Sequence, residues 1–393
     1  MLYACNLSAE IFERARCHMG RARTIRGMDI LFSHFSALVI LRTYRCLTPA
    51  GIMPHLAATV PLRPPASREL FHAMGTNQLL GALESPIELL AESGRRRSNS
   101  IYARESHYSL PVGAAIDLGS FKCVSPEHLV VQMAARLDDL QLAVLLGELM
   151  GTYAINPCLG EMCQVREPMT TPDAVQAYLG DLGSFPGTSR VRRCLKMMPP
   201  GSGSPRETRL ALRLSLPPAL GGYHLPVAAL NEELNVQDLR ADLPRRIRRP
   251  DILLAVPDVE FGWKGSPRCV AIEYDGATHY NGERHARDVE RQTELMAAGL
   301  KEYVVGRQQY ADLEYMDGLA SLIRKDLGMS RIGLTSQEAE RRRELRRHLY
   351  QRLEAIDEKT LGSLHPQAQP CADENGSEPW GEDVVPVSAY GLD

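Results

Sequence analysis

The sequence predicts an α/β C-terminal domain with a small mixed sheet flanked by helices, preceded by a mixed, largely helical N-terminal region. Residues 204–329 alternate between segments of helical and of strand periodicity. Residues 125–154 hold two apolar helices with capping residues. Residues 184–203 are rich in Gly, Pro and Ser, which is typical of a linker. The order helix-strand-strand-helix-strand-helix after this linker favours an α/β domain.

The composition is that of an ordinary globular protein. The chain has 393 residues, a formal net charge of −3 and 44% hydrophobic residues, enough for two or three domains. No apolar run reaches the roughly 18 residues of a membrane span, and no secretory signal is evident, so we expect a cytoplasmic protein without a membrane partner. The nine cysteines lack CxxC pairs, which favours buried thiols over a metal site at Cys158 and Cys163.

The N-terminal part divides into an extension and a region of unknown role. We expect residues 1–27 to be weakly ordered, with Met28 as an alternative start, and residues 28–183 to form the N-terminal region. Within it, Ser125 caps a predicted helix that begins at Pro126, and a second helix begins at Asp138 or Asp139. Their apolar spacing predicts a helical hairpin with a structural role.

The predicted domain of residues 204–329 contains six elements in order. They are the helix SPRETRLALRLSL, the strands RRIRRPDILLAV and CVAIEYD, the helix ERHARDVERQTELMAAG, the strand LKEYVVG and the helix ADLEYMDGLASLIRKDLG. Residues 330–360 then form a charged helix with a capping box of Thr335 and Glu338. Residues 361–393 have six acids and no Lys or Arg, which predicts a disordered acidic tail.

The predicted strand of residues 269–275 contains two candidate metal-binding carboxylates. Because side chains alternate, Glu273 and Asp275 share one face, about 6.5–7 Å apart, opposite a predicted core face. Two such carboxylates repel each other unless a cation binds them. Asp251, on the neighbouring predicted strand, adds a third carboxylate, and this donor set suits Mg²⁺ or Mn²⁺. The alternative is a solvated acidic face that ends in a turn.

Gly276 permits a sharp turn that brings His279 back towards the strand end. A histidine there serves as a general base or positions a water molecule. Glu207, on the first helix of the domain, stands three residues after Ser204, and a capping box explains this spacing without any chemistry.

Asp251, then Glu273-x-Asp275-Gly276-x-x-His279, then ARDVERQTELMAAGLKEYVVG resemble the Vsr-like (very-short-patch-repair) endonuclease domains of the PD-(D/E)XK superfamily. The resemblance covers roughly residues 204–328. It implies a restriction-endonuclease-like mixed sheet and a metal-dependent DNA endonuclease for repair or phage defence, without a small-molecule cofactor. The implied site residues are the metal ligands Asp251, Glu273 and Asp275, the catalytic His279, and an auxiliary Glu207.

A second resemblance and a departure keep another interpretation open. FSHFSALVILR, VSPEHLVVQMAARL, ELMGTYA and GGYHLP loosely resemble bacterial abortive-infection regulators of the type IV antitoxin kind. The superfamily's lysine, two residues after the strand acid, is replaced here by Asp275, and Lys264 in FGWKGSP is a candidate substitute from a predicted loop. The alternative is therefore a catalytically inactive nucleic-acid-binding regulator or antitoxin with a cognate toxin.

Arginines beside the site predict contacts with nucleic acid, and DNA is the expected partner. We expect phosphate groups to be bound by the first arginine cluster: Arg240, Arg245, Arg246, Arg248 and Arg249. Arg291 contacts a phosphate, clamps the carboxylates, or forms a surface ion pair with Asp288 or Glu294. The arginines of residues 341–347 alternate with glutamates, which favours a solvated face of salt bridges.

Overall fold

The computed structural model describes residues 30–48, 55–56, 60–94, 96–98, 100–105, 110–237, 245–256, 269–275, 282–330 and 333–362. The chain forms two compact units, which are described separately. The first comprises residues 1–37 and 54–125, and the second comprises residues 38–53 and 126–393. The division falls within helix α2 (His34–Leu47). The predicted N-terminal extension and the acidic tail beyond Gly362 lie outside the described residues.

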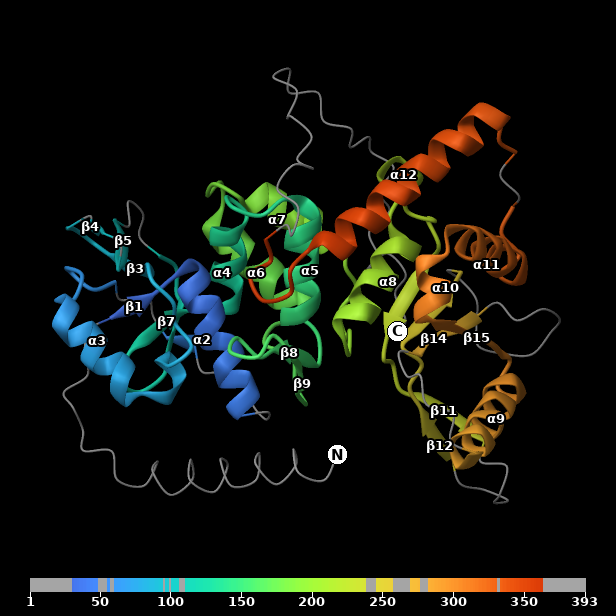
Figure 1. Ribbon diagram of the computed structural model, residues 1–393, viewed down its shortest axis with the longest axis horizontal. Coiled ribbons are helices and arrows are strands. Elements are labelled where there is room, and N and C mark those ends of the chain that lie inside the picture. Colours follow the sequence, from blue (N-terminus) through green and yellow to red (C-terminus); the bar gives the residue numbers. More distant parts are fainter. Residues whose placement is uncertain are drawn as a thin grey trace. The chain divides into compact units, whose positions relative to one another are not determined.

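The first unit contains a seven-stranded sheet of order β2-β6-β7-β1-β3-β5-β4 (Figure 1). Helix α3 (Ser67–Thr76) also belongs to it. The strands are β1 (Leu31–Phe32), β2 (His55–Leu56), β3 (Ile87–Ala91), β4 (Arg96–Arg97), β5 (Ile101–Glu105), β6 (Ala115–Asp117) and β7 (Lys122–Val124). A largely helical region is therefore the wrong description of this part. Strands of two to five residues are too short to show a period of two, and β3 is buried along its whole length.

The second unit begins with a helical part. It contains α4 (Pro126–Met133), α5 (Asp139–Leu149), α6 (Pro172–Leu182), α7 (Thr188–Leu195) and the hairpin of β8 (Tyr153–Ile155) and β9 (Met162–Gln164). The predicted helices α4 and α5 are present and in contact. The Asp138 side chain caps α5 by accepting hydrogen bonds from the amides of Leu140 and Gln141, both at 2.9 Å.

The predicted linker of residues 184–203 contains a helix. Val191 and Cys194 of α7 are fully buried, and Arg190 and Arg193 of the same helix pair with Asp139 of α5. This eight-residue helix was not predicted because it lies between Gly- and Pro-rich segments and has only a narrow apolar face. No helix of the described part is long and apolar enough to cross a membrane.

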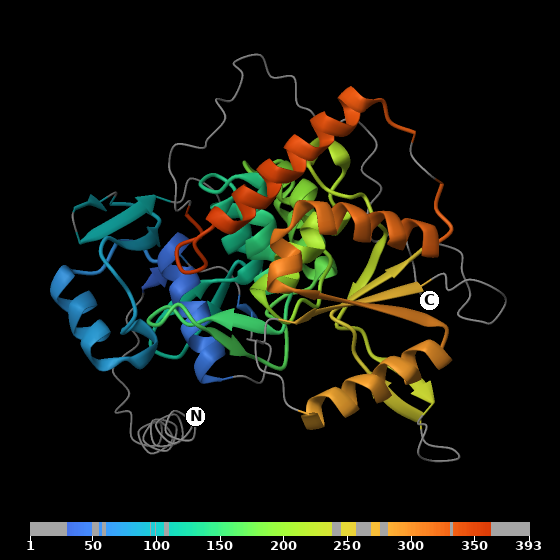
Figure 2. The same ribbon diagram turned by 45° about the vertical axis from the view of Figure 1, so that its right-hand side comes forward.

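A four-stranded sheet follows, which we call the C-terminal sheet. Its order is β10 (Val227–Leu230), β13 (Ile252–Ala255), β14 (Cys269–Asp275) and β15 (Leu300–Gly306). The first three strands are antiparallel, whereas β14 and β15 are parallel and joined through α9 (Gly282–Ala297). Figure 2 shows α9 on one side of this sheet and α11 (Leu313–Asp326) on the other. The sequence thus predicted β14, α9, β15 and α11 correctly.

Both faces of β14 are buried. Cys269 and Ala271 pack in a cluster with Leu295 of α9, on the face that also carries Glu273. On the opposite face Val270 and Ile272 are fully buried. The interpretation of one core face was therefore incomplete, because the carboxylate face is also core until Glu273.

The predicted strand RRIRRPDILLAV is two strands. Residues Arg245–Arg248 form β12, which pairs with β11 (Leu234–Gln237) in a separate two-stranded ribbon, and β13 begins only at Ile252. Pro250 lies between them and has no amide hydrogen to donate to a ladder. The sequence prediction also missed β10 and β11, each of four residues.

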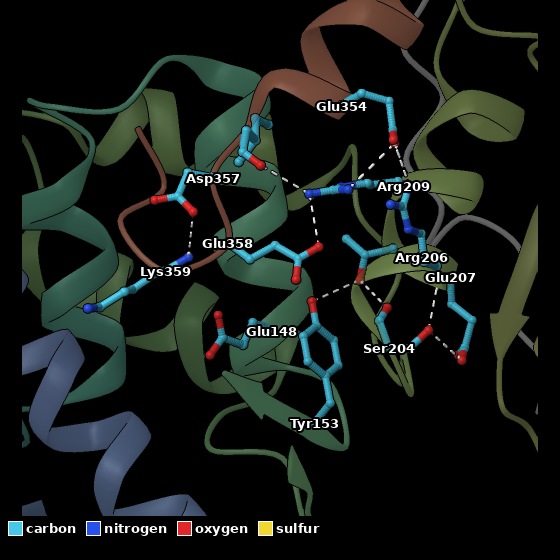
Figure 3. A network of polar contacts seen from close by, with 12 residues as sticks. Glu148, Tyr153, Ser204, Arg206, Glu207, Arg209, Glu354, Asp357, Glu358 and Lys359 are labelled. Carbon is cyan, nitrogen blue, oxygen red and sulfur yellow. Dashed lines mark hydrogen bonds and ion pairs between the residues drawn. The ribbon is translucent and has the colours of Figure 1, made fainter. Parts of the chain in front are cut away.

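The elements that surround the sheet are helical. Helix α8 (Pro205–Ser215) precedes it, and α10 (Arg307–Ala311) joins β15 to α11. Helix α12 (Ser336–Ala355) has the predicted capping box of Thr335 and Glu338. At its C-terminal end, Arg206 and Arg209 of α8 bind Glu354 and Glu358 at 2.7 and 3.0 Å (Figure 3).

Candidate functional site

Asp251 and Glu273 meet on adjacent strands of the C-terminal sheet. Ile252 of β13 pairs with Ile272 of β14, so Asp251, one residue earlier, lies at the level of Glu273. One oxygen of the Asp251 carboxylate accepts a hydrogen bond from the amide of Tyr274 at 2.6 Å. The Glu273 side chain is only 13% exposed. The local cause is the register, because antiparallel partners present their side chains on the same face.

Burial and like charge act together on this pair. Burial raises the pKa of Asp251 to about 8, and the negative charges of Glu273 and Glu207 contribute in the same direction. The amide of Tyr274 and the charge of Arg291 lower the Asp251 pKa in part. Burial also raises the pKa of Glu273, against the effect of Arg291. A carboxyl of this kind holds its proton unless a cation replaces it.

Arg291 of α9 lies between two glutamates. It forms an ion pair with Glu273 and donates from Nε and Nη2 to Oε1 of Glu302 on β15, at 3.0 and 2.8 Å. The side chain of Glu302 is 5% exposed. Of the roles considered for Arg291, the structure therefore shows the clamp on a site carboxylate. Of the two ion-pair partners considered for Arg291, Glu294 binds Arg248 instead, and the side chain of Asp288 lies outside the described residues.

Glu207 is held at the N-terminus of α8. Its carboxylate accepts hydrogen bonds from the Gly203 amide at 2.7 Å, from Ser204 Oγ at 2.8 Å and from Asn231 Nδ2 at 2.6 Å. Figure 3 shows Ser204 and Glu207 next to each other. Three donors give the side chain a structural role at the helix start, as the spacing from Ser204 predicted. Its charge nevertheless reaches Asp251.

Two residues of the site were missed from the sequence. Asn231, directly after β10, has a φ of 53° and donates its amide hydrogen to the Asp251 carbonyl at 3.1 Å. Its side chain joins that strand end to Glu207, and an Asn after an apolar strand is a recognisable signal because it tolerates the left-handed conformation. Glu302 lies in a predicted strand, but nothing in its local pattern indicates Arg291 as its partner.

The remaining predicted site residues are not brought to this pair by the described part of the chain. Asp275 is the exposed last residue of β14, in register with Gly306. His279, Gly276 and Lys264 lie outside the described residues. Within the described ranges, no three His, Cys, Asp or Glu side chains are grouped closely enough to hold a metal ion.

The arginines predicted to bind phosphate have different environments. Arg248 forms an ion pair with Glu294, which is fully buried, with Nε 2.7 Å from Oε2. Arg248 is thus engaged in neutralising an interior carboxylate, which removes it from the predicted interface. Arg249 pairs with Glu233 on the surface. Arg245 and Arg246 lie on β12, but their side chains, like all of Arg240, fall outside the described residues.

In comparisons with known proteins, no protein-family model, curated protein or solved structure matches this chain. The proposed function therefore rests on the geometry of the Asp251 and Glu273 carboxylates. Among the described cysteines all are free thiols, of which Cys123, Cys194 and Cys269 are buried and Cys158 is exposed.

Proposed function

We propose that the C-terminal sheet bears a divalent-metal-dependent phosphodiesterase site, acting on DNA, with Asp251 and Glu273 as the metal ligands. The observation that supports the proposal is the pairing of these two carboxylates at adjacent strand ends, in a setting that raises the pKa of Asp251 to about 8. Ionising two acidic groups that lie together away from water is unfavourable unless a cation binds them. Perturbed carboxyls of this kind gather at functional sites.

The donor set fits Mg²⁺ or Mn²⁺. Both carboxylates offer oxygen, which these ions prefer, and the Tyr274 amide engages only one oxygen of Asp251. A bound divalent ion would polarise a phosphate and lower the pKa of the attacking water. In this proposal Asp275, two residues after Glu273 on β14, would join the ligand set when the ion binds. His279, which follows in the sequence, would orient or deprotonate the water.

Arg291 takes a second role in this proposal. The superfamily that the sequence resembles places a lysine where this chain has Asp275, so the site lacks that cation. The Arg291 guanidinium, already beside Glu273, supplies a positive charge at the same end of the sheet. Its bond to Glu302 fixes its position and leaves it oriented towards the site.

One observation favours a second candidate, a nucleic-acid-binding regulator that does not cut. Arg291 already neutralises Glu273 without a metal ion. Because the Arg291 guanidinium neutralises the Glu273 carboxylate, the folded protein is stable without a bound metal ion. In that case the sheet would serve as a binding platform alone.

The test is cleavage of a supercoiled plasmid and of a single-stranded oligonucleotide with Mg²⁺ or Mn²⁺. We expect cleavage by the wild-type protein, and a loss of at least about a hundredfold in Asp251→Asn and Glu273→Gln, because each removes a metal-binding charge. Glu314→Gln, an exposed acid on α11, is the matched control and should cleave normally. Binding of DNA without cleavage by the wild type would favour the regulator, and unchanged cleavage in Asp251→Asn would contradict the site.

A further inference from the structure

Helix α12 carries four arginines that form no ion pair with the described residues, and we call this cluster the arginine face: Arg341, Arg342, Arg343 and Arg347. Successive helix residues lie about 100° apart, so the four side chains surround most of the helix at this level. Three of them are exposed and Arg342 is half-buried. In the described part of the chain none of the four forms an ion pair, although Glu340 and Glu344 lie on the same helix. Most of these arginines are solvated, as predicted, but the described residues show none of the expected salt bridges between them and the glutamates of the same helix.

Other arginines of the same helix show the contrast. Arg346 binds Asp317 of α11 at 2.9 Å, and Arg352 binds Asp138 at 2.8 Å. These two point towards neighbouring elements and find acids there. The four residues of the arginine face pair with no acid among the described residues, so their positive charge is left unbalanced there.

Arg324, near the end of α11, adds to this charge. Burial and the neighbouring positive charge of Arg342 both lower the pKa of Arg324. Its Nε is buried and has no hydrogen-bond partner among the described residues. Two guanidinium groups close enough to oppose each other's charge create a local positive potential, which attracts anionic groups.

The chain itself contains a matching anion. Residues 363–393 have six acids and no Lys or Arg, and five of the acids lie between Asp373 and Asp383. This segment leaves the described part at Gly362, just beyond the end of α12. Ten residues lie between Gly362 and Asp373, and the eleven steps from one to the other can span up to about 36 Å. From Ala355 back to Arg342 along the helix is roughly 20 Å, so the acids can reach the arginine face.

We propose that the acidic segment of residues 373–383 docks on the arginine face of α12, within the same chain. Tethering gives such a segment an effective concentration on the order of millimolar, which outcompetes weak external anions. Trp380 stands among the acids and offers a ring that a guanidinium can stack on. The docked segment shields the arginine face from phosphate groups. This inference is independent of the carboxylate site.

Trp380 provides the measurement. The full chain has two tryptophans, so the Trp263→Phe variant leaves Trp380 as its only one. We expect acrylamide to quench Trp380 about twofold less efficiently at low salt than at 0.5 M NaCl, because salt screens the contacts between segment and helix. In the same chain with the arginine face changed to Gln at all four positions, quenching should be efficient at every salt concentration.

A charge exchange gives a second, independent readout. Arg341, Arg342, Arg343 and Arg347 are changed to Glu, and the five acids of residues 373–383 to Lys. Either change alone should expose Trp380, and the two together should restore its protection at low salt. Quenching that is the same in all these proteins and at all salts would overturn the proposal. DNA binding that needs the arginine face but ignores the acids would also overturn it, and would assign the face to nucleic acid.

Discussion

At the scale of single residues, the surroundings of Asp251 change the pKa of its carboxyl group. Its carboxyl is largely buried between Glu273 and the amide of Tyr274, and the Glu207 charge reaches it as well. Burial comes first among the causes that raise its pKa to about 8. At neutral pH the metal-free protein therefore holds a proton on Asp251, and this proton is part of the fold's stability.

The first prediction follows from the sign of this shift. The folded pKa lies above the ordinary value of 3.8, so the folded state binds more protons between pH 4 and 8. Metal-free stability should fall as pH rises through this window, by up to about 1.4 kcal/mol for each pKa unit. Urea unfolding of Asp251→Asn from pH 4 to 8 should show a weaker fall than wild type or the Glu314→Gln control. Equal slopes in all three proteins would show that Asp251 titrates normally.

At the scale of elements, the sequence predicted the parts of the C-terminal sheet that have a clear period. Strand β15 and helix α9 lie where their apolar patterns indicated. Asp251 and Glu273 share a face because they lie opposite each other at the edge of an antiparallel pair of strands. The short strands, by contrast, were not predicted. The first unit's sheet and β10 offer too few residues for a pattern, and Pro250 divided a run that looked continuous.

Tertiary partners explain the errors among the site residues. Arg248 was assigned to nucleic acid because its neighbours are basic, yet its charge neutralises Glu294, 46 positions later on α9. Asn231 and Glu302 entered the site through contacts that no local pattern encodes. Sequence patterns indicate which face a side chain occupies, but not which distant residue meets it.

The second prediction concerns Arg248 and Arg249, which are adjacent in sequence but differ in burial. Arg248→Gln removes a cation that neutralises the buried Glu294 and should lower the free energy of unfolding by about 3–5 kcal/mol. Arg249→Gln breaks an exposed pair with Glu233 and should cost about 1 kcal/mol or less. Guanidinium denaturation measures both. Similar losses for the two variants would contradict the contrast between the buried and the exposed pair.

At the scale of the whole molecule, charge is segregated although the net charge is only −3. Carboxylates gather at the end of the C-terminal sheet and, in the sequence, in residues 373–383. Along α12 lie arginines that form no ion pair with any residue the structure describes. Composition alone hides this separation, because the opposite charges cancel in the total. Each concentration of one sign implies a partner of the other sign. For the sheet we propose a divalent cation, and for α12 the chain's own acids.

The most direct measurement is calorimetric titration of the metal-free protein with Mn²⁺ at pH 5.5 and pH 8. The account predicts one binding event that is tighter at pH 8, because the Asp251 proton must leave before the ion binds. Asp251→Asn should lose at least about tenfold in affinity, while Glu314→Gln should bind as the wild type does. Absence of Mn²⁺ binding at both pH values, or equal binding by Asp251→Asn and wild type, would contradict the metal site.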